Sequence, residues 1–421
     1  MIWRLQKLGI LCEIEKGNIG IQAAIPGKYP LVATSEDRKT HNEYYFIEPA
    51  VCIPTVSSTG HGHASLNRIH FQDGKFSAGS ILAVCTPLKE SSLNAEFLYY
   101  YLSFFKDSIL VPLMQGSANV TLKISDLKNI EIPLPSFNDQ IFLINKFKEY
   151  IEKNELLKSE LQHQCDLIKK LRKSILQDAV QGEIVKQDPK DEKTSILIEK
   201  IKKEKQKLID SKKTKDKFPL HKNSKEYPPY EIPNNWQWVR FWDIAWCYRG
   251  HNPPKTNFIK ESKNGYIRFI QITDFKTDTQ AVYVPINKQL KLVHKGEIVM
   301  AAYRHIGKLS RNMEGAFNVA LCKINNIEPF NRDYLELVIK TDLVTGELLA
   351  ASERGHIPSM HSEHLLSLWV PVPPLSEQER IVAKVQELMQ TCDALEKEIE
   401  QSKIQVQHLT QSVLREAFEG K

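Results

Sequence analysis

The sequence lacks the patterns that mark several common classes of protein. No run of apolar residues approaches the roughly 18 needed to span a membrane, and no apolar secretory segment follows the initial methionine. The seven cysteines are scattered, and no two of them have the CxxC spacing typical of zinc and redox sites. These absences favour a cytoplasmic protein with reduced thiols and no membrane partner.

Motifs for the commonest enzyme chemistries are also missing. The chain has no GxxxxGK[ST] phosphate loop and no HExxH zinc motif, and no cysteine accompanies the histidines His61, His63 and His70. Residues 252–255 (Asn-Pro-Pro-Lys) are similar to the Asn-Pro-Pro-aromatic signature of amino-methyltransferases, but lysine has no ring to stack on an extruded base. We therefore expect no catalytic residues, no cofactor and no metal in this chain.

The net charge of +6 comes from one segment of the chain. Residues 183–225 contain 14 lysines against 8 acidic residues, which accounts for the whole excess. A lysine-rich tether is often merely soluble, so this charge alone is weak evidence for binding to nucleic acid. Within the segment, residues 195–210 have apolar side chains at helical spacing, which predicts a short basic helix.

The most informative pattern is an internal repeat with a constant offset of 238 residues. Pro133, Gln140 and Gly182 recur as Pro371, Gln378 and Gly420, and each glutamine is followed by a long apolar-periodic stretch that ends at the glycine. Such a duplication allows one chain to imitate a twofold dimer. Proteins with twofold symmetry commonly bind two half-sites on DNA.

Both periodic stretches predict long helices with a hydrophobic seam. The spacing of the seam residues, 4, 7, 3 and 4, is that of a coiled coil with one polar position. They are Leu157, Leu161, Ile168, Leu171 and Ile175 in the first copy, and Leu395, Ile399, Val406, Leu409 and Val413 in the second. A simple core stripe is the alternative, but two equal seams in one chain favour antiparallel pairing of the two helices.

The regions that precede the two helices have patterns typical of mixed α/β units. The predicted elements follow in the same order in both regions. Strands are predicted at residues 47–56 and 81–86 and a helix at 94–106 in the first region. Strands at 267–272 and 297–302 and a helix at 331–340 are predicted in the second. The sequence therefore predicts an α+β protein with two mixed α/β domains, two long helices forming an antiparallel coiled coil, and an internal pseudo-twofold repeat.

Polar loops that follow predicted strands are the best candidates for DNA contacts. Hydroxyl, amide and imidazole groups with little apolar bulk suit base edges, and cationic groups suit phosphates. The candidates are Ser58, Thr59, His61, His63 and Asn67 in the first domain and Arg304, His305, Lys308 and Arg311 in the second. For any single residue, a solvated loop position is an equally good interpretation.

Taken together, these segments resemble a type I restriction-modification specificity (S) subunit. The resemblance rests on residues 130–135 with Asp139-Gln140, on 368–374 with 376–381 (Ser-Glu-Gln-Glu-Arg-Ile), and on the helix ends 173–182 and 411–420. Residues 187–192 and 230–236 add to it. It covers nearly the whole chain in order. The first copy departs from the pattern at residues 136–141 (Ser-Phe-Asn-Asp-Gln-Ile).

The resemblance implies a non-catalytic subunit that reads a bipartite, asymmetric DNA site. It implies two modification subunits, which methylate adenine with S-adenosylmethionine, and restriction subunits that join for translocation and cleavage. The expected organisation is target-recognition domain 1 (1–135), spacer helix 1 (136–182), a basic linker with a short helix (183–225), target-recognition domain 2 (226–373) and spacer helix 2 (374–421).

Two alternatives stay open at the level of the sequence. A pseudo-symmetric coiled-coil adaptor that binds proteins rather than DNA would show no salt-dependent affinity for DNA. An unrecognised methyltransferase or nuclease would bind S-adenosylmethionine or a metal ion as the isolated chain.

Overall fold

A computed structural model describes residues 3–59, 62–117, 119–214, 220–221, 224–277, 279–352 and 360–419. The contacts between Cα atoms divide the chain into two compact units. Unit 1 comprises Met1–His163 and Ile399–Lys421, and unit 2 comprises Gln164–Glu398. None of the described helices combines the length and the hydrophobicity that crossing a lipid bilayer requires.

Unit 1 contains two main sheets and a two-stranded ribbon. The first sheet has the strand order β2-β8-β5-β6 with antiparallel neighbours. The second has the order β4-β3-β7, in which β3 and β7 are parallel, and β1 pairs with β9. The strands are β1 (Arg4–Lys7), β2 (Cys12–Lys16), β3 (Tyr29–Val32), β4 (Lys39–His41), β5 (Ala50–Pro54), β6 (His70–Gln72), β7 (Ser77–Ala78), β8 (Leu82–Pro87) and β9 (Glu131–Leu134).

The core of unit 1 lies between the first sheet and the helices that cover it. The apolar face of α2 packs there together with the first turns of α4 (Phe137–Gln181), which contribute Leu143, Ile144 and Phe147. Asn94 caps α2, because its Oδ1 atom accepts hydrogen bonds from the N–H groups of Glu96 and Phe97. The helices are α1 (Leu8–Leu11), α2 (Ala95–Ile109), α3 (Ile124–Lys128) and three short 3-10 turns, η1 (Ile21–Ala23), η2 (Lys89–Ser91) and η3 (Val111–Leu113).

Unit 2 repeats the sheet topology of unit 1. Its first sheet has the order β11-β18-β15-β16, again antiparallel, and its second sheet, β13-β12-β17-β14, also contains one parallel pair, β12 with β17. Strand β10 pairs with β19 as β1 does with β9. The strands are β10 (Gln237–Arg240), β11 (Ala245–Arg249), β12 (Tyr266–Ile270), β13 (Val282–Pro285), β14 (Leu292–Val293), β15 (Ile298–Ala301), β16 (Leu309–Ser310), β17 (Gly315–Phe317), β18 (Leu321–Asn326) and β19 (Trp369–Val372).

The helices of unit 2 include a counterpart of α2. Asn331 caps α7 as Asn94 caps α2, with its Oδ1 atom accepting from the N–H groups of Asp333 and Tyr334. The helices are α5 (Thr194–Asp210), α6 (Phe241–Ile244), α7 (Arg332–Lys340), α8 (Asp342–Ser352), α9 (Ser362–Leu366) and the 3-10 turns η4 (Lys255–Asn257) and η5 (Ile272–Phe275). The predicted strands and helices of both halves, and the internal repeat, are therefore confirmed.

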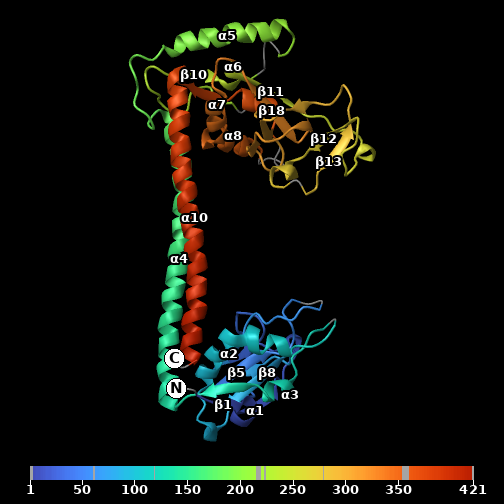
Figure 1. Cartoon of the computed structure of the whole chain (residues 1–421), viewed down its shortest axis with the longest axis vertical. Helices are drawn as coiled ribbons and strands as arrows, with labels where there is room; N and C mark the ends of the chain where they lie inside the picture. The colour runs from blue at the N-terminus through green and yellow to red at the C-terminus, as the bar shows by residue number, and fades with distance from the viewer. Residues whose placement is uncertain are drawn as a thin grey trace. The chain divides into compact units, whose positions relative to one another are not determined.

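Two 45-residue helices, α4 (Phe137–Gln181) and α10 (Leu375–Glu419), run antiparallel to one another (Figure 1). Within unit 2, Arg172 of α4 donates hydrogen bonds to Asp393 at 2.5 Å and to Glu396 at 3.1 Å, both on α10. Helix α4 ends at Gln181, and Gly182 follows it with a left-handed φ of 81°, as the sequence predicts. Gly420, the predicted end of α10, lies outside the described residues.

The predicted seam is only half buried, which corrects the expectation from its spacing. Leu161, Ile168 and Ile175 are buried, but Leu157 and Leu171 are exposed. In the second copy Ile399 is buried, whereas Leu395 and Leu409 are exposed. Two helices bury one row of side chains between them and leave the neighbouring row open to solvent. The periodicity predicts a helical apolar face but does not reveal how many helices share it.

The described part of the basic segment packs against unit 2. The carboxylate of Asp191 accepts two hydrogen bonds from Arg380, at 3.0 and 2.6 Å, and one from Ser376 at 2.6 Å. Helix α5 follows, as predicted, and Thr194 at its first position donates to the carbonyl oxygen of Asn235 at 2.5 Å. The segment is therefore more than a tether between the two halves of the sequence.

Candidate nucleic-acid interface

The first candidate site is the loop between β5 and β6, which a cluster of hydroxyl groups holds in shape. The Oγ atom of Ser58 lies 2.6 Å from that of Ser65 and donates to Oδ1 of Asn67 at 3.0 Å. Thr59 donates through its Oγ1 atom to the carbonyl oxygen of His63 at 3.3 Å. These side chains of Ser58, Thr59, His63 and Asn67 are exposed, so the structure brings four of the five first-domain candidates together on one loop. His61 lies outside the described residues.

Two features fix this loop to the body of unit 1. Leu66 is buried in the core, and the N–H of Ser57 donates to the carbonyl oxygen of Val120 at 2.9 Å. A cavity of about 280 Å³ is lined by Ser57, Ser58, Asn67 and Arg68, among others. The donors are therefore presented from an anchored loop, which lowers the cost of ordering them on a ligand.

Two arginines beside the loop were not predicted. Arg68 is exposed and pairs with Glu36 at 2.6 Å. Arg38, on the turn before β4, donates to Nδ1 of His70 at 3.0 Å and to Oε1 of Gln72 at 3.1 Å. Burial, followed by the charges of Arg38 and Arg68, lowers the pKa of His70 to about 4, so its imidazole is neutral at pH 7. Arg68 directly follows Asn67 in the sequence, whereas nothing in the sequence points to Arg38.

The second candidate site is the tight turn 302–308 between β15 and β16. The N–H of His305 donates to the carbonyl oxygen of Tyr303 at 2.7 Å, and this turn holds Arg304 at a φ of 61°, a left-handed conformation that a non-glycine residue rarely adopts. Arg304, His305 and Lys308 are exposed. Backbone strain of this kind is found mainly at functional sites.

Two residues anchor this turn from below. Ile306 is buried, and Gly307, with a φ of 86°, approaches α8 so closely that a Cβ atom would lie 2.6 Å from Cγ2 of Thr345. A side chain at position 307 would therefore displace the turn. The three exposed cationic or imidazole groups are thus carried on a turn whose backbone is fixed.

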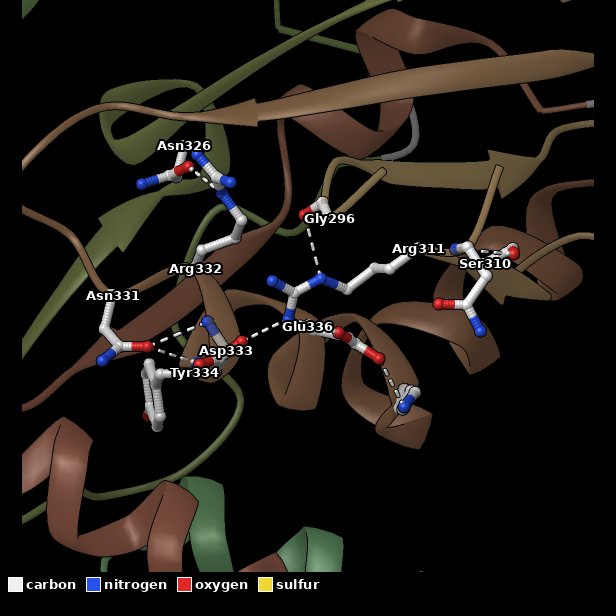
Figure 2. A network of polar contacts seen from close by, with 11 residues as sticks. Gly296, Ser310, Arg311, Asn326, Asn331, Arg332, Asp333, Tyr334 and Glu336 are labelled. Atoms are coloured by element: carbon white, nitrogen blue, oxygen red, sulfur yellow. Dashed lines mark hydrogen bonds and ion pairs between the residues drawn. The ribbon is translucent and has the colours of Figure 1, made fainter. Parts of the chain in front are cut away.

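Arg311 differs from the other candidates because its side chain is held within its own domain (Figure 2). Its Nε atom donates to the carbonyl oxygen of Gly296 at 3.0 Å, and its Nη1 atom pairs with Asp333 and, at 3.2 Å, with Glu336. Both acids lie on α7. These contacts give Arg311 a role in joining the β16 strand to α7, and they separate it from Arg304, His305 and Lys308.

No group of three or more His, Cys, Asp or Glu is placed to hold a metal ion among the residues that the structure describes. His70 is engaged by Arg38, and His364 is buried against the ring of His221 at 4.6 Å between centroids. His70 and His364 therefore each have another partner.

The fold and these two sites define an internally repeated protein in which each sheet-rich half presents a polar loop. Residues 2–164 and 233–404 match the family described as type I restriction modification DNA specificity domain. The chain therefore belongs to the family of type I restriction-modification DNA specificity subunits. It is a specificity component and not a catalytic one, and this membership does not favour the adaptor alternative.

Similar proteins agree with this assignment. The chain is 25% identical over 430 residues to the EcoDI type I restriction enzyme specificity subunit of Escherichia coli, covering 99% of this chain and 88% of that one. It is 32% identical over 251 residues to the EcoAI specificity subunit of the same organism, covering 55% and 41%. The latter match therefore concerns only part of each protein.

Solved structures share the fold. A chain from a structure on complex assembly and conformational transition of the type I R-M system matches with a TM-score of 0.64 at 18% identity, covering 99% of this chain and 97% of that one. The HsdS subunit from Thermoanaerobacter tengcongensis matches with a TM-score of 0.50 at 17% identity and the same coverage. The predicted α+β architecture with two domains and a coiled coil is thereby confirmed.

Proposed function

We propose that the chain reads a bipartite DNA target, with the loop between β5 and β6 at one half-site and the turn between β15 and β16 at the other. The observation that carries this proposal is the topological equivalence of the two sites. Each connects the third and fourth strands of a four-stranded sheet, in the orders β2-β8-β5-β6 and β11-β18-β15-β16. Two readers at equivalent places in a repeated fold suit a target with two halves.

The chemistry of the two sites differs, which suits an asymmetric target. The first site offers the neutral donors and acceptors of Ser58, Thr59, His63 and Asn67, which can pair with base edges. The second offers Arg304, His305 and Lys308, which can bind guanine or phosphates. Arg311 does not enter this proposal, since its guanidinium is engaged by Asp333 and Glu336. We expect a different base preference in each half-site.

The chain also assembles, in this proposal, with the other subunits of a type I restriction-modification complex. The exposed leucines of the coiled coil support two equivalent docking surfaces. Leu157 and Leu171 on α4 are related to Leu395 and Leu409 on α10 by the offset of 238 residues, and all four are exposed. Exposed apolar rows on helices suit helical partners. Two modification subunits would bind there, and restriction subunits would join that complex.

Salt-dependent DNA binding tests this function against a protein-binding adaptor. The complex of the chain with its modification subunit is titrated with a DNA duplex that contains its target, at a series of salt concentrations. Because phosphate contacts release counterions, the logarithm of the affinity should fall linearly with the logarithm of salt concentration. An intact complex that binds no DNA would contradict the proposal and favour the protein-binding adaptor instead.

A further inference from the structure

One face of unit 2 is covered by the segment that joins the two halves of the sequence. Asp191 pairs with Arg380 at the start of α10, and Lys205 of α5 donates to the carbonyl oxygen of Trp242 at 2.7 Å and lies 3.4 Å from Asp243. Farther along, the ring of Tyr230 packs edge-on against that of Trp238 at 4.9 Å. The described residues between 187 and 230 therefore contact β10, α6 and the first turn of α10.

Unit 1 has the same face, because the backbone contacts around it repeat. Leu5 lies opposite Pro133 in the β1–β9 ribbon as Trp238 lies opposite Pro371 in β10–β19. The N–H of Leu8 donates to the carbonyl oxygen of Ile130 at 2.8 Å, and that of Phe241 donates to Leu368 at 2.8 Å. The residues of unit 1 that correspond to Trp238, Asp243, Leu375 and Arg380 are thus Leu5, Ile10, Phe137 and Phe142.

In unit 1 all four of these positions are apolar and open to solvent. The exposed fractions are 56% for Leu5, 64% for Ile10, 52% for Phe137 and 60% for Phe142. Phe137 also forms part of the wall of a cavity of about 400 Å³, together with Pro87 and the exposed Leu88. Scattered apolar residues are normal on a surface, but Leu5, Ile10 and Phe142 stand at positions that the joining segment contacts in unit 2, and this coincidence indicates a binding face.

We propose that this face of unit 1 binds an amphipathic segment of a partner protein, with a short extended stretch and a helix that follow the path of residues 187–210 on unit 2. The chemistry of the face defines the occupant. Phe142 occupies the position of Arg380, which pairs with Asp191 in unit 2. Ile10 occupies the position of Asp243, which lies beside Lys205 in unit 2. The partner segment therefore carries apolar side chains at the two places where this chain has Asp191 and Lys205. This proposal goes beyond DNA reading and does not depend on it.

A second copy of the chain fits the face less well. Its own residues 187–210 are held on its unit 2 by Arg380, Asn235 and Trp242. Moreover, Asp191 and Lys205 would be buried against Phe142 and Ile10 without a charged partner, and unpaired buried charges are strongly unfavourable. A second copy is therefore not the occupant.

Peptide binding to the full-length chain tests the proposal. The probe is a fluorescent peptide of residues 185–212 that carries Asp191→Leu and Lys205→Leu, and the matched control is the peptide with the original sequence. Fluorescence anisotropy should show saturable binding of the substituted peptide, at least about tenfold tighter than the control, because no charge is buried unpaired. Absence of saturable binding by the substituted peptide would overturn the proposal.

A substitution in the chain identifies the face. Phe142→Arg places an arginine where Arg380 stands in unit 2. The variant should therefore bind the doubly substituted peptide more weakly, and it should bind a peptide that has Lys205→Leu but retains Asp191 more tightly. Ile286→Arg, at another exposed apolar position in unit 2, should change neither affinity. Binding that is indifferent to Phe142→Arg would place the peptide elsewhere and contradict the proposal. Circular dichroism of each variant controls for folding, and DNA binding by the same complex remains a separate readout.

Discussion

Gln140 and Gln378, 238 positions apart, make the same hydrogen bonds in the two halves of the molecule. The Oε1 atom of Gln140 accepts from the N–H of Asn94 at 2.8 Å, and that of Gln378 accepts from the N–H of Asn331 at 3.0 Å. Each Nε2 atom donates to a proline carbonyl, of Pro135 at 3.0 Å and of Pro373 at 2.9 Å. Both side chains are fully buried. Each glutamine thus ties the start of a long helix to the cap of a domain helix.

Replacement of Gln378 should destabilise unit 2. In Gln378→Leu the N–H of Asn331 and the carbonyl of Pro373 lose their partner in a buried site, which should cost about 1–3 kcal/mol for an orphaned group. The measurement is the free energy of unfolding in urea. Glu379→Leu, at the exposed neighbouring position, is the control. Equal stability of the two variants would show that the buried amide contributes nothing.

Substitutions of Arg304 and Arg311 should have separate effects, one on DNA recognition and the other on the free energy of unfolding. Arg304→Ala should leave the unfolding free energy unchanged and relax one position of one half-site, because a good base contact contributes about 1–3 kcal/mol of discrimination. Arg311→Met should instead lower stability by about 1 kcal/mol, through its lost pairing with Asp333 and Glu336, and leave the target unchanged. Urea unfolding and the mapping of methylated sites measure the two effects.

Two other results would contradict these roles. If Arg304→Ala weakened binding to all sequences equally, Arg304 would be a phosphate contact. If Arg311→Met altered the target without a loss of stability, its pairing with α7 would not be its function.

The ion pair between Asp191 and Arg380 predicts a dependence of stability on pH. Hydrogen bonds from Arg380, and then from Ser376, hold the pKa of Asp191 below its ordinary value. A depressed carboxyl pKa contributes stability above the ordinary value of about 3.9, and this contribution is lost as pH falls through the folded-state pKa. The stability advantage of the wild type over Asp191→Asn should therefore be full at pH 6 and shrink below about pH 4. A constant difference across that range would exclude the carboxylate as its source.

The exposed leucine rows predict the behaviour of assembly variants. Leu157→Glu should weaken binding of a modification subunit at the surface that includes α4, and Leu395→Glu should do the same at the equivalent surface that includes α10. Each single variant should yield complexes with one modification subunit, and the double variant should yield none, because a buried carboxylate opposes an apolar contact. Native mass spectrometry measures the stoichiometry. Full assembly of the double variant would contradict docking on these rows.

The sequence predicts the larger features of the fold because they depend on repeated, local patterns. Periodic apolar residues and the glycine at position 182 predict α4 and its end, and the repeated order of strands predicts two equivalent domains. The exposure of Leu157 and Leu171 could not be predicted, because a heptad pattern is the same whether its second row contacts a helix of this chain or of a partner.

Side-chain contacts across long stretches of sequence were also beyond prediction. An arginine that follows a strand, as Arg311 does, is typical of a DNA contact. Only the fold shows that Asp333 and Glu336 of α7 lie beside it. The apolar residues Ile10 and Phe142 are likewise unremarkable alone. Their assignment to a binding face follows from the comparison with Asp243 and Arg380. That comparison requires the strand register of the β1–β9 and β10–β19 ribbons.

The most direct test of the account is the mapping of methylated adenines in cells that express this chain with its modification subunit, by single-molecule sequencing. We expect a split motif with two specific halves separated by a non-specific spacer, methylated once in each half. A continuous motif, or an assembled complex that binds DNA without modifying any defined sequence, would contradict the reading of a bipartite target by the two loops.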